Sequence, residues 1–546
     1  MESGSRAGRR TGDVGNGCVM AIDIGTGSCR SIIFDEAGQQ LSAGQREWSH
    51  PEIPGIPGSH VFETARNWKL ICEGIREALS GAGLPKGSLR AVATASMREG
   101  MVLSDAADRE IWACANIDAR GIDEAAELVR TGEAERLFDT GGNWVSITSA
   151  PRFRWIRRHQ PEIAERTAHV SMLSDWVVTR LSGEHVTDPS CGSSSGLFDL
   201  RTFDWSRELI DIVGFDPGIF PPVVAPGTRV GRVTGRAAEE TGLPQGTPVV
   251  VGGADTQLGL LGIGVTNPGL RTVVAGSFWQ TTAVTDHCLI DRERRLRTLC
   301  HVLPGLWMVE GIGTYCGIIM RWFRDAFCEP EKAEALRRGV DPYVVMEEEA
   351  ARIPPGSNGV WGIFGDLLDA KRWLLASPSF LGFNVEDPVG SSRAACIRAV
   401  EESAAYVTLG HMRIIDELTG AATTEALFTG GSAKGSLWPQ IAADMLGVTL
   451  KIPLVKESTA LATAFCAGKG VGMYDDLAEV ARRLVRYERT VEPDPSAHER
   501  YAELYDRWRE IYRYQLALVE AGLLPPLWRA PGVSFGAGGK TRSAGN

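Results

Sequence analysis

Short runs of valine, isoleucine and alanine alternate with long amphipathic segments along most of the chain. The apolar runs predict strands, and the segments with apolar positions three or four residues apart predict helices. The expected strands cover residues 19–24, 31–35, 91–96, 248–252 and 270–275. The expected helices cover residues 61–80, 118–130, 394–418, 437–446 and 499–520. This alternation predicts an α/β fold with largely buried sheets.

The pattern repeats coarsely in the second half of the chain. Residues 19–35 are expected to form a strand, a glycine-led turn and a second strand, and residues 270–285 follow the same order. A duplicated domain with a cleft between the copies would give this repeat. Glycine, asparagine and proline at 264–269 interrupt the pattern and mark the expected boundary. The predicted organisation is a disordered head over 1–17, a first domain over 18–265, a second domain over 266–530 and a disordered tail over 531–546.

Composition removes several classes of function. The chain has 546 residues with 57 Lys and Arg against 68 Asp and Glu, and this net charge of -11 argues against non-specific nucleic-acid binding. The longest apolar stretch, residues 249–265, contains Asp255 and Gln257 and is too polar to cross a membrane. The first 17 residues lack the apolar core of a signal peptide. Eleven cysteines without a CxxC pattern indicate reduced thiols, so we expect a cytoplasmic protein. Nine histidines without a tight cluster give no case for a zinc site.

Residues 20–35, MAIDIGTGSCRSIIFD, combine a carboxylate with a turn rich in hydrogen-bond donors. Asp23 lies near the end of an expected buried strand, Gly25 to Ser28 form the turn, and Arg30 follows on the next strand. Backbone N–H groups of such a turn can bind an anion, and the carboxylate beside it can hold Mg²⁺ through water. An ordinary glycine-rich hairpin with a turn-stabilising aspartate is the alternative. The sequence contains neither a P-loop nor a dinucleotide fingerprint.

Residues 249–262, VVVGGADTQLGLLG, place a carboxylate directly after an apolar strand. Asp255 lies where the strand end meets an expected helix start, and ligands collect at the carboxyl ends of strands in open α/β sheets. An aspartate at this position can accept a proton from a substrate hydroxyl. The alternative is an aspartate that only caps the helix.

Arg98 and Glu99 follow a strand of small residues in ASMREG, residues 95–100. Adjacent opposite charges at a strand end can bind a polyol, since one side chain donates hydrogen bonds and the other accepts them. A solvated charge pair is the alternative.

Two further glycine loops follow expected strands in the second half. Gly276 and Ser277, in VVAGSFWQTT, can present N–H and hydroxyl groups to a phosphate. Gly430 and Gly431 precede an amphipathic helix, and their lack of side chains lets the backbone approach a flat ring or a phosphate. A plain hairpin turn and a loop at a helix start are the respective alternatives.

The order and spacing of these motifs resemble those of the FGGY carbohydrate kinases, from about residue 18 to residue 530. This family is part of the actin, hexokinase and Hsp70-like ATPase group. The resemblance implies two α/β domains of the ribonuclease H-like type with the active-site cleft between them. A finer similarity, to the branch of the family that acts on 4,5-dihydroxypentane-2,3-dione, is carried by the stretches SMREGMVL, IWACANIDAR, SITSAPRFRW, GSFWQ, MRWFRDAFC, PLVKESTAL and RLVRYERTVEPDP.

The same resemblance implies a role for each matching residue. Asp255 matches the catalytic base, and Asp23 and Asp255 would lie at the Mg²⁺. The substrate-binding residues would be Arg98, Glu99, Asp255 and Gln257. The nucleotide-binding residues would be Thr26, Gly27, Ser28, Arg30, Gly276, Ser277, Gly430, Gly431, Ser432 and Lys434. Two hydroxyl contacts are missing because the family pattern has threonine and serine at the positions of Gly27 and Cys29, and Arg152 stands where lysine is usual.

The implied activity is transfer of a phosphoryl group from ATP, with Mg²⁺, to a hydroxyl of a small sugar-like substrate. The first expected acceptor is the primary hydroxyl of the linear dione, and the second is glycerol, xylulose or ribulose. The third reading is a nucleotide-binding regulator on the same fold that has lost catalysis, against which the intact set of Asp23, Asp255, Arg98 and Glu99 counts. No nucleic-acid or membrane partner is expected, a homodimer is left open, and the sequence identifies no regulatory partner.

Overall fold

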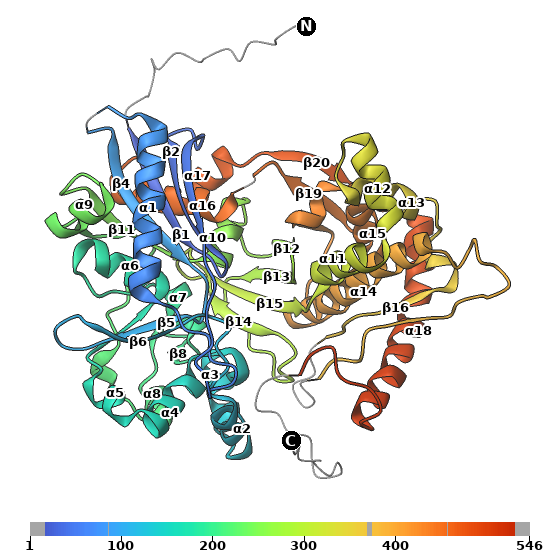
Figure 1. Cartoon of the computed structure of the whole chain (residues 1–546), viewed down its shortest axis with the longest axis horizontal. Helices are drawn as coiled ribbons and strands as arrows, with labels where there is room; N and C mark the ends of the chain where they lie inside the picture. The colour runs from blue at the N-terminus through green and yellow to red at the C-terminus, as the bar shows by residue number, and fades with distance from the viewer. Residues whose placement is uncertain (1–16, 86, 368–373, 456, 530–546) are drawn as a thin grey trace, which may run out of the picture.

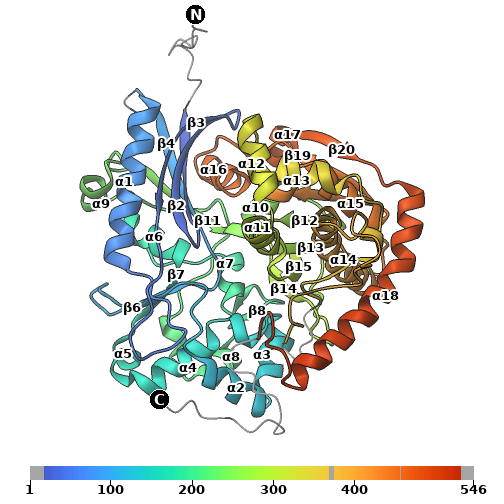
Figure 2. The same ribbon diagram turned by 45° about the vertical axis from the view of Figure 1, so that its right-hand side comes forward.

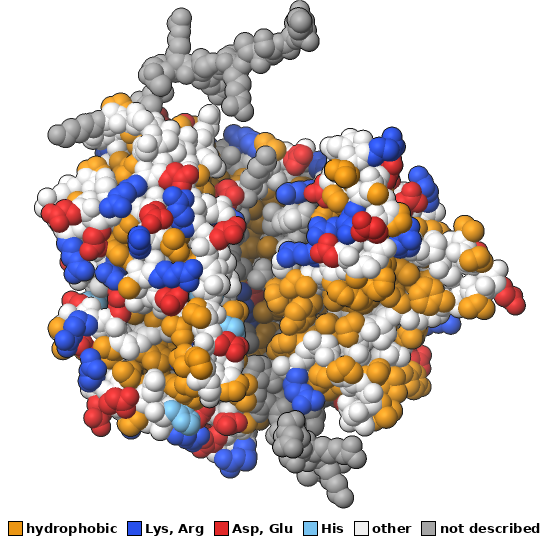
Figure 3. Space-filling model, viewed as in Figure 1, with side chains coloured by type: hydrophobic (Ala, Val, Ile, Leu, Met, Phe, Trp, Pro, Cys, Tyr) orange, Lys and Arg blue, Asp and Glu red, His pale blue; other side chains and the backbone are white. Residues whose placement is uncertain are grey.

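The computed structural model describes residues 17–85, 87–367, 374–455 and 457–529, and it divides into two halves that each contain a mixed sheet (Figure 1). The expected disordered tail, and all of the expected disordered head except Gly17, lie outside the described residues. A groove runs between the two halves in the space-filling view (Figure 3). Within the described ranges, no helix has the length and apolar character that crossing a membrane requires.

The first sheet has the strand order β10-β11-β4-β1-β2-β3. Strands β1, β2 and β3 are antiparallel neighbours, whereas β4 and β11 run parallel to β1 and β10 runs antiparallel to β11. Their bounds are Cys18–Ile24 for β1, Ser28–Asp35 for β2, Gln40–Glu47 for β3, Leu89–Ser96 for β4, Arg229–Arg232 for β10 and Pro248–Ala254 for β11.

The second sheet, in the order β14-β15-β13-β12-β18-β19-β20, repeats this pattern. Strands β12, β13 and β15 are antiparallel neighbours, β18 and β19 continue in parallel with β12, and β20 closes the edge antiparallel. The bounds are Arg271–Ala275 for β12, Trp279–Thr285 for β13, Arg297–Cys300 for β14, Trp307–Gly313 for β15, Glu425–Thr429 for β18, Thr449–Pro453 for β19 and Tyr487–Val491 for β20. The predicted duplication is therefore confirmed, with β14 as the addition in the second copy.

Both faces of the first sheet are covered, which explains the continuous apolar run in β1. Met20 and Ile22 pack in the cluster that contains Ile71 and Ile75 of α1 (Thr64–Ala82). The alternate residues of β1 pack on the other face, against α16 (Ser458–Gly470). Because side chains alternate across a strand, a strand buried on both faces is apolar throughout.

Helix α16 belongs to the second half of the sequence, yet it lies on the first sheet. It packs against β1, β4 and α10 (Asp255–Gly262), and a Cβ added at Gly262 would lie 2.0 Å from the carbonyl oxygen of Ser458. Helix α17 (Leu477–Leu484) joins the same cluster. The division of the chain at residues 265 and 266 separates the two sheets but not their covering helices, and it stays a proposal.

All five predicted helices are present: α1, α2 (Ile122–Arg130), α14 (Arg393–Thr419), α15 (Leu437–Leu446) and α18 (Pro495–Glu520). Helix α18 begins earlier than predicted because the Asp494 side chain accepts hydrogen bonds from the N–H groups of Ser496 and Ala497. It runs along the outer side of the second half (Figure 2). Helix α2 begins later than predicted because Asp118 is held outside it by a buried ion pair with Arg120.

The remaining elements form smaller layers around the two sheets. A three-stranded sheet, β6-β5-β7, lies below the first sheet with most of the short helices of the first half (Figure 1). The strands of this sheet are β5 (Met101–Ser104), β6 (Glu110–Cys114) and β7 (His169–Met172). Two further pairs of strands are β8 (Phe198–Asp199) with β9 (Asp204–Trp205) and β16 (Trp361–Ile363) with β17 (Ser379–Leu381). The helices are α3 (Glu133–Gly141), α4 (Ala150–His159), α5 (Pro161–Arg166), α6 (Leu173–Ser182), α7 (Pro189–Ser194), α8 (Arg207–Val213), α9 (Gly235–Thr241), α11 (Cys316–Phe327), α12 (Glu329–Arg338) and α13 (Pro342–Ala350).

Candidate active site

Asp255 is the first residue of α10, directly after the carboxyl end of β11. The preceding glycines are needed there, since a Cβ added at Gly252 would lie 2.0 Å from the carbonyl oxygen of Thr94 on β4. The Asp255 carboxylate accepts a hydrogen bond of 2.6 Å from the N–H of Thr256 and one of 3.3 Å from its hydroxyl. Asp255 is half-buried, so the rest of its carboxylate surface is accessible to a ligand.

Asp23 lies beside Asp255 because β1 and β11 both pair with β4. The register places Asp23 and Gly253 opposite the same residue, Ala95. The pKa of Asp23 is raised from 3.8 to about 7, first by burial and then by the Asp255 carboxylate, while Arg30 opposes the shift. The Oδ1 atom of Asp23 is buried without a hydrogen-bond partner among the described residues. Two neighbouring carboxylates, one with an orphaned oxygen, provide a donor set that suits Mg²⁺.

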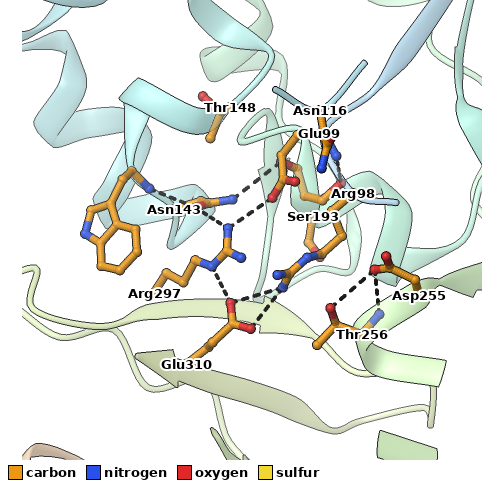
Figure 4. A network of polar contacts seen from close by, with 12 residues as sticks. Arg98, Glu99, Asn116, Asn143, Thr148, Ser193, Asp255, Thr256, Arg297 and Glu310 are labelled. Atoms are coloured by element: carbon orange, nitrogen blue, oxygen red, sulfur yellow. Dashed lines mark hydrogen bonds and ion pairs between the residues drawn. The ribbon is translucent and has the colours of Figure 1, made fainter. Parts of the chain in front are cut away.

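Arg98 and Glu99 belong to a buried network of four charges (Figure 4). Arg98 Nη1 lies 3.1 Å from Glu310 Oε2, and Arg297 Nε lies 2.5 Å from the same oxygen. Arg297 Nη1 also lies 3.0 Å from Glu99 Oε1. The network joins the end of β4 in the first half to β14 and β15 in the second. This geometry excludes the alternative of a solvated charge pair at Arg98 and Glu99.

The charges in this network act on Asp255. Burial would lower the pKa of Arg98, but Glu310, Glu99 and Asp255 together raise it, so the guanidinium stays charged. Burial raises the pKa of Asp255, and the Arg98 charge opposes that shift. The result is a carboxylate with a pKa above its usual value beside a permanent positive charge. Such a group can accept a proton more readily than an ordinary aspartate.

Arg152 supports this site from α4. Its guanidinium donates to three backbone carbonyls: that of Glu99, that of Asn116 at 2.6 Å and that of Asp118 at 3.0 Å. The Asn116 side chain in turn donates to the Thr26 hydroxyl at 3.0 Å, which links this segment to the first glycine turn. A lysine could not satisfy three separated carbonyls with one ammonium group, because only the guanidinium presents five donors in a fork.

The first glycine turn joins β1 to β2. Thr26 and Gly27 are exposed, and a Cβ added at Gly27 would meet nothing within 4 Å, so a ligand can approach the backbone at Gly27. The Trp48 indole N–H holds the turn from one side through the carbonyls of Gly25 and Thr26. Arg30 Nη1 lies 2.9 Å from Oε2 of Glu457, the residue before α16, so this ion pair orients it.

Gln257 lies one position beyond Thr256 on α10 and is completely buried. Its amide N–H donates to the Cys300 carbonyl on β14 at 3.3 Å, and the structure describes no hydrogen-bond partner for its Oε1. The contact therefore directs Gln257 towards the second sheet. Its sequence-predicted contact with the substrate stays a prediction.

The second set of predicted residues lines a different cavity, of about 520 Å³, in the second half. It contains Gly276 and Ser277 from the loop after β12, together with Gly431, Ser432 and Lys434 from the turn after β18. Gly430 adjoins them with φ 102°, and a Cβ there would lie 2.5 Å from the Ala275 carbonyl oxygen. The close approach of two strand ends thus requires glycine at 430. Helices α11, α13, α14 and α15 provide most of the remaining lining.

The structure thus gathers the predicted residues into two groups at equivalent ends of the duplicated sheets. Asp23, Arg98, Glu99 and Asp255 come together at the carboxyl ends of β1, β4 and β11, and two glycine loops come together after β12 and β18. Sequence reasoning missed Arg297 and Glu310 as partners in the first group. A single carboxylate inside the apolar run of β15, WMVEGIG, is the local signal that could have identified Glu310.

Comparison with known proteins covers most of this architecture. Residues 18–262 match the N-terminal domain, and residues 281–470 the C-terminal domain, of the FGGY family of carbohydrate kinases. Autoinducer-2 kinase of Salmonella paratyphi B is 42% identical over 518 residues, which cover 94% of this chain and 98% of that protein. Autoinducer-2 kinase of Escherichia coli O139:H28 is 44% identical over 519 residues, with coverage of 94% and 98%.

Solved structures agree with the fold. Xylulose kinase from Rhodospirillum rubrum superposes with a TM-score of 0.80 at 25% identity, covering 92% of this chain and 99% of that one. Plasmodium falciparum glycerol kinase with ADP gives a TM-score of 0.81 at 17% identity, covering 91% and 98%. The predicted fold of two actin- and hexokinase-like domains is confirmed.

Proposed function

We propose, from the premise that this chain belongs to the FGGY family of carbohydrate kinases, that its acceptor is autoinducer-2 in its linear form, 4,5-dihydroxypentane-2,3-dione. Membership of the family makes the chain an ATP-dependent kinase. The finer assignment of substrate rests on 42–44% identity to autoinducer-2 kinases over 94% of the chain. Use of ATP would place the reaction in the cytoplasm.

Asp255 is the proposed catalytic base, and its place beside Arg98 at the end of β11 is the observation that carries the proposal. The primary hydroxyl oxygen of the substrate attacks the γ-phosphorus of ATP while its proton passes to the Asp255 carboxylate. The new O–P bond forms as the bond from the γ-phosphorus to the bridging oxygen breaks, and ADP leaves. Catalysis of this kind depends on positioning and electrostatics, which the buried charge network supplies.

Asp23 and Asp255 are the residues that would hold Mg²⁺. The orphaned Oδ1 of Asp23 and the mutual repulsion of the two carboxylates both support this assignment. When bound, the ion supplies positive charge to the phosphates. The chain's own part is to keep the two carboxylates adjacent through their shared neighbour β4.

Arg98 and Glu99 are the proposed substrate ligands. The Arg98 guanidinium can donate hydrogen bonds to carbonyl oxygens of the dione, and the Glu99 carboxylate can accept them from its hydroxyl groups. Both side chains are already oriented by Glu310 and Arg297, so little ordering is needed on binding. Gln257, two positions beyond Asp255 on α10, is the further proposed substrate ligand.

The three glycine-rich loops of the chain are the proposed nucleotide site. Thr26, Gly27, Ser28 and Arg30 would contact the terminal phosphate beside the base. Gly276 and Ser277 would contact the inner phosphates. The 520 Å³ cavity with Gly430, Gly431, Ser432 and Lys434 would then take the adenosine.

The experiment that tests this proposal is ADP release from Mg-ATP with four acceptors: the dione, glycerol, xylulose and ribulose. We expect the kcat/KM of the dione to exceed that of each other acceptor by at least about tenfold, a difference of about 1.4 kcal/mol. A higher kcat/KM with xylulose or ribulose would keep the chemistry and overturn the substrate. ATP binding without ADP release on any acceptor would favour the non-catalytic regulator.

A further inference from the structure

The cavity proposed for adenosine is lined by a buried carboxyl group, one oxygen of which has no hydrogen-bond partner among the described residues. Glu401 on α14 lines this cavity and is 2% exposed. Its Oε2 atom makes no hydrogen bond to any described residue. The backbone of the same residue is fixed, since its carbonyl accepts a 3.1 Å hydrogen bond from the Trp438 indole N–H. A buried polar group beside a cavity, with no protein partner, is suited to a ligand in that cavity.

Charged groups on each side of Glu401 favour its neutral form. Burial raises the pKa of Glu401 well above its usual value, and the carboxylate of Glu347 on α13 raises it further. On α14 itself, Arg398 lowers the pKa and Glu402 raises it, but Arg398 is committed to Glu402 at 2.9 Å. Arg489 on β20 faces Glu347, with its guanidinium bonded to nearby backbone carbonyls. Glu401 therefore presents one O–H donor and one carbonyl acceptor.

Glu347 cannot take the same role because the protein already uses its carboxylate. It accepts a 3.1 Å hydrogen bond from the N–H of Ser436, just before α15, and packs against Gly435. Helices α13, α14 and α15 lie together in the second half (Figure 1), so this contact fixes the turn that follows β18. The Glu347 carboxyl group thus forms part of the cavity wall through its contact with the backbone, and Glu401 is left to face a ligand.

We propose that Glu401 recognises the adenine base, accepting a hydrogen bond from the N6 amino group and donating one to N7. The inference rests on the proposed nucleotide site. Adenine presents a donor at N6 and an acceptor at N7, whereas guanine presents acceptors at both O6 and N7. One donor and one acceptor on Glu401 match adenine and place its carbonyl against O6 of guanine. Glu401 would therefore select ATP over GTP.

The test is the affinity of Mg-ATP and Mg-GTP without acceptor, measured by calorimetry on the wild type, E401Q and E401M. Glutamine keeps one donor and one acceptor, so E401Q should bind both nucleotides within threefold of the wild type. Methionine has similar length without hydrogen-bonding groups, so E401M should lose about tenfold in ATP affinity and less than threefold in GTP affinity. Unchanged ATP affinity in E401M, or equal losses for ATP and GTP, overturns the inference.

A measurement on the unaltered protein covers the case that E401M does not fold. The nucleotide 7-deaza-ATP lacks the N7 acceptor and should bind the wild type about tenfold more weakly than ATP. Equal affinities for ATP and 7-deaza-ATP would overturn the inference about Glu401. The proposed function would still be supported if the protein released ADP with the dione. Failure of the wild type to bind either nucleotide would instead contradict the proposed function together with this inference.

Discussion

Arg297 Nη1 lies 3.0 Å from Glu99 Oε1, and this buried contact joins the two halves of the chain at the base of the active site. Glu99 follows β4 of the first sheet, and Arg297 opens β14 of the second. The same guanidinium also pairs with Glu310, which is completely buried. A substrate held by Glu99 therefore contacts a side chain whose position depends on both halves.

Replacing Arg297 by methionine should destabilise the protein strongly. The R297M variant would leave Glu310 and Glu99 with one cation, Arg98, between them, and breaking a buried pair by removal of one partner costs about 3–5 kcal/mol. Urea unfolding would measure the loss. The matched control is R236M, which removes an exposed ion pair with Glu240 and should change the unfolding free energy by at most about 0.5 kcal/mol. Equal effects of the two substitutions would contradict the role of the network.

Asparagine at position 255 should abolish turnover without weakening the fold. Loss of a general base lowers kcat by about 10²- to 10⁴-fold. Because burial raises the pKa of Asp255, its charged form is disfavoured in the folded protein, and D255N should be at least as stable as the wild type. ADP release and thermal unfolding would check both points, with the exposed Asp139→Asn as the control. Substantial ADP release by D255N with the dione would refute the assignment of the base.

Local features such as buried strands could be predicted from the sequence, whereas contacts between residues far apart in the chain could not. The apolar runs in β1 and β11 predicted strands with both faces buried, since burial on both faces leaves its mark on every position of a strand. The packing of α16 on the first sheet could not be predicted from the sequence. An amphipathic pattern shows that a helix has an apolar face, but it does not show which element packs against that face. Arg297 follows other arginines in residues 292–297, and only its distance from Glu99 and Glu310 distinguishes it.

Stability should depend on pH through Asp23. Its pKa rises from 3.8 to about 7 on folding, so the folded state binds the proton more tightly than the unfolded state. The stabilisation is full below about pH 4 and is lost as the pH rises through about 7. The D23N variant should therefore lack this loss and have a higher Tm than the wild type above pH 7, without Mg²⁺. Thermal unfolding from pH 5 to pH 8 would show it.

Magnesium provides the companion measurement for Asp23. Saturating MgCl2 at pH 8 should raise the Tm of the wild type, because a ligand that binds the folded state stabilises it. D23N should respond less, since it lacks one carboxylate of the proposed site. If D23N and the wild type show the same pH profile and the same response to MgCl2, neither the shifted carboxyl nor the magnesium assignment holds.

Replacing Arg152 by lysine should show whether Arg152 positions the substrate-binding residue Glu99 or only stabilises the fold. R152K keeps the charge but loses contacts to the carbonyls of Glu99, Asn116 or Asp118, each a hydrogen bond to a charged group worth about 1.5–3 kcal/mol. We expect a higher KM for the acceptor with a smaller change in kcat, because Glu99 loses its orientation while Asp255 keeps its own contacts. ATP affinity should stay within about twofold of the wild type. The exposed Arg130→Lys is the control and should behave as the wild type. A loss of stability with an unchanged acceptor KM would make Arg152 a structural residue only.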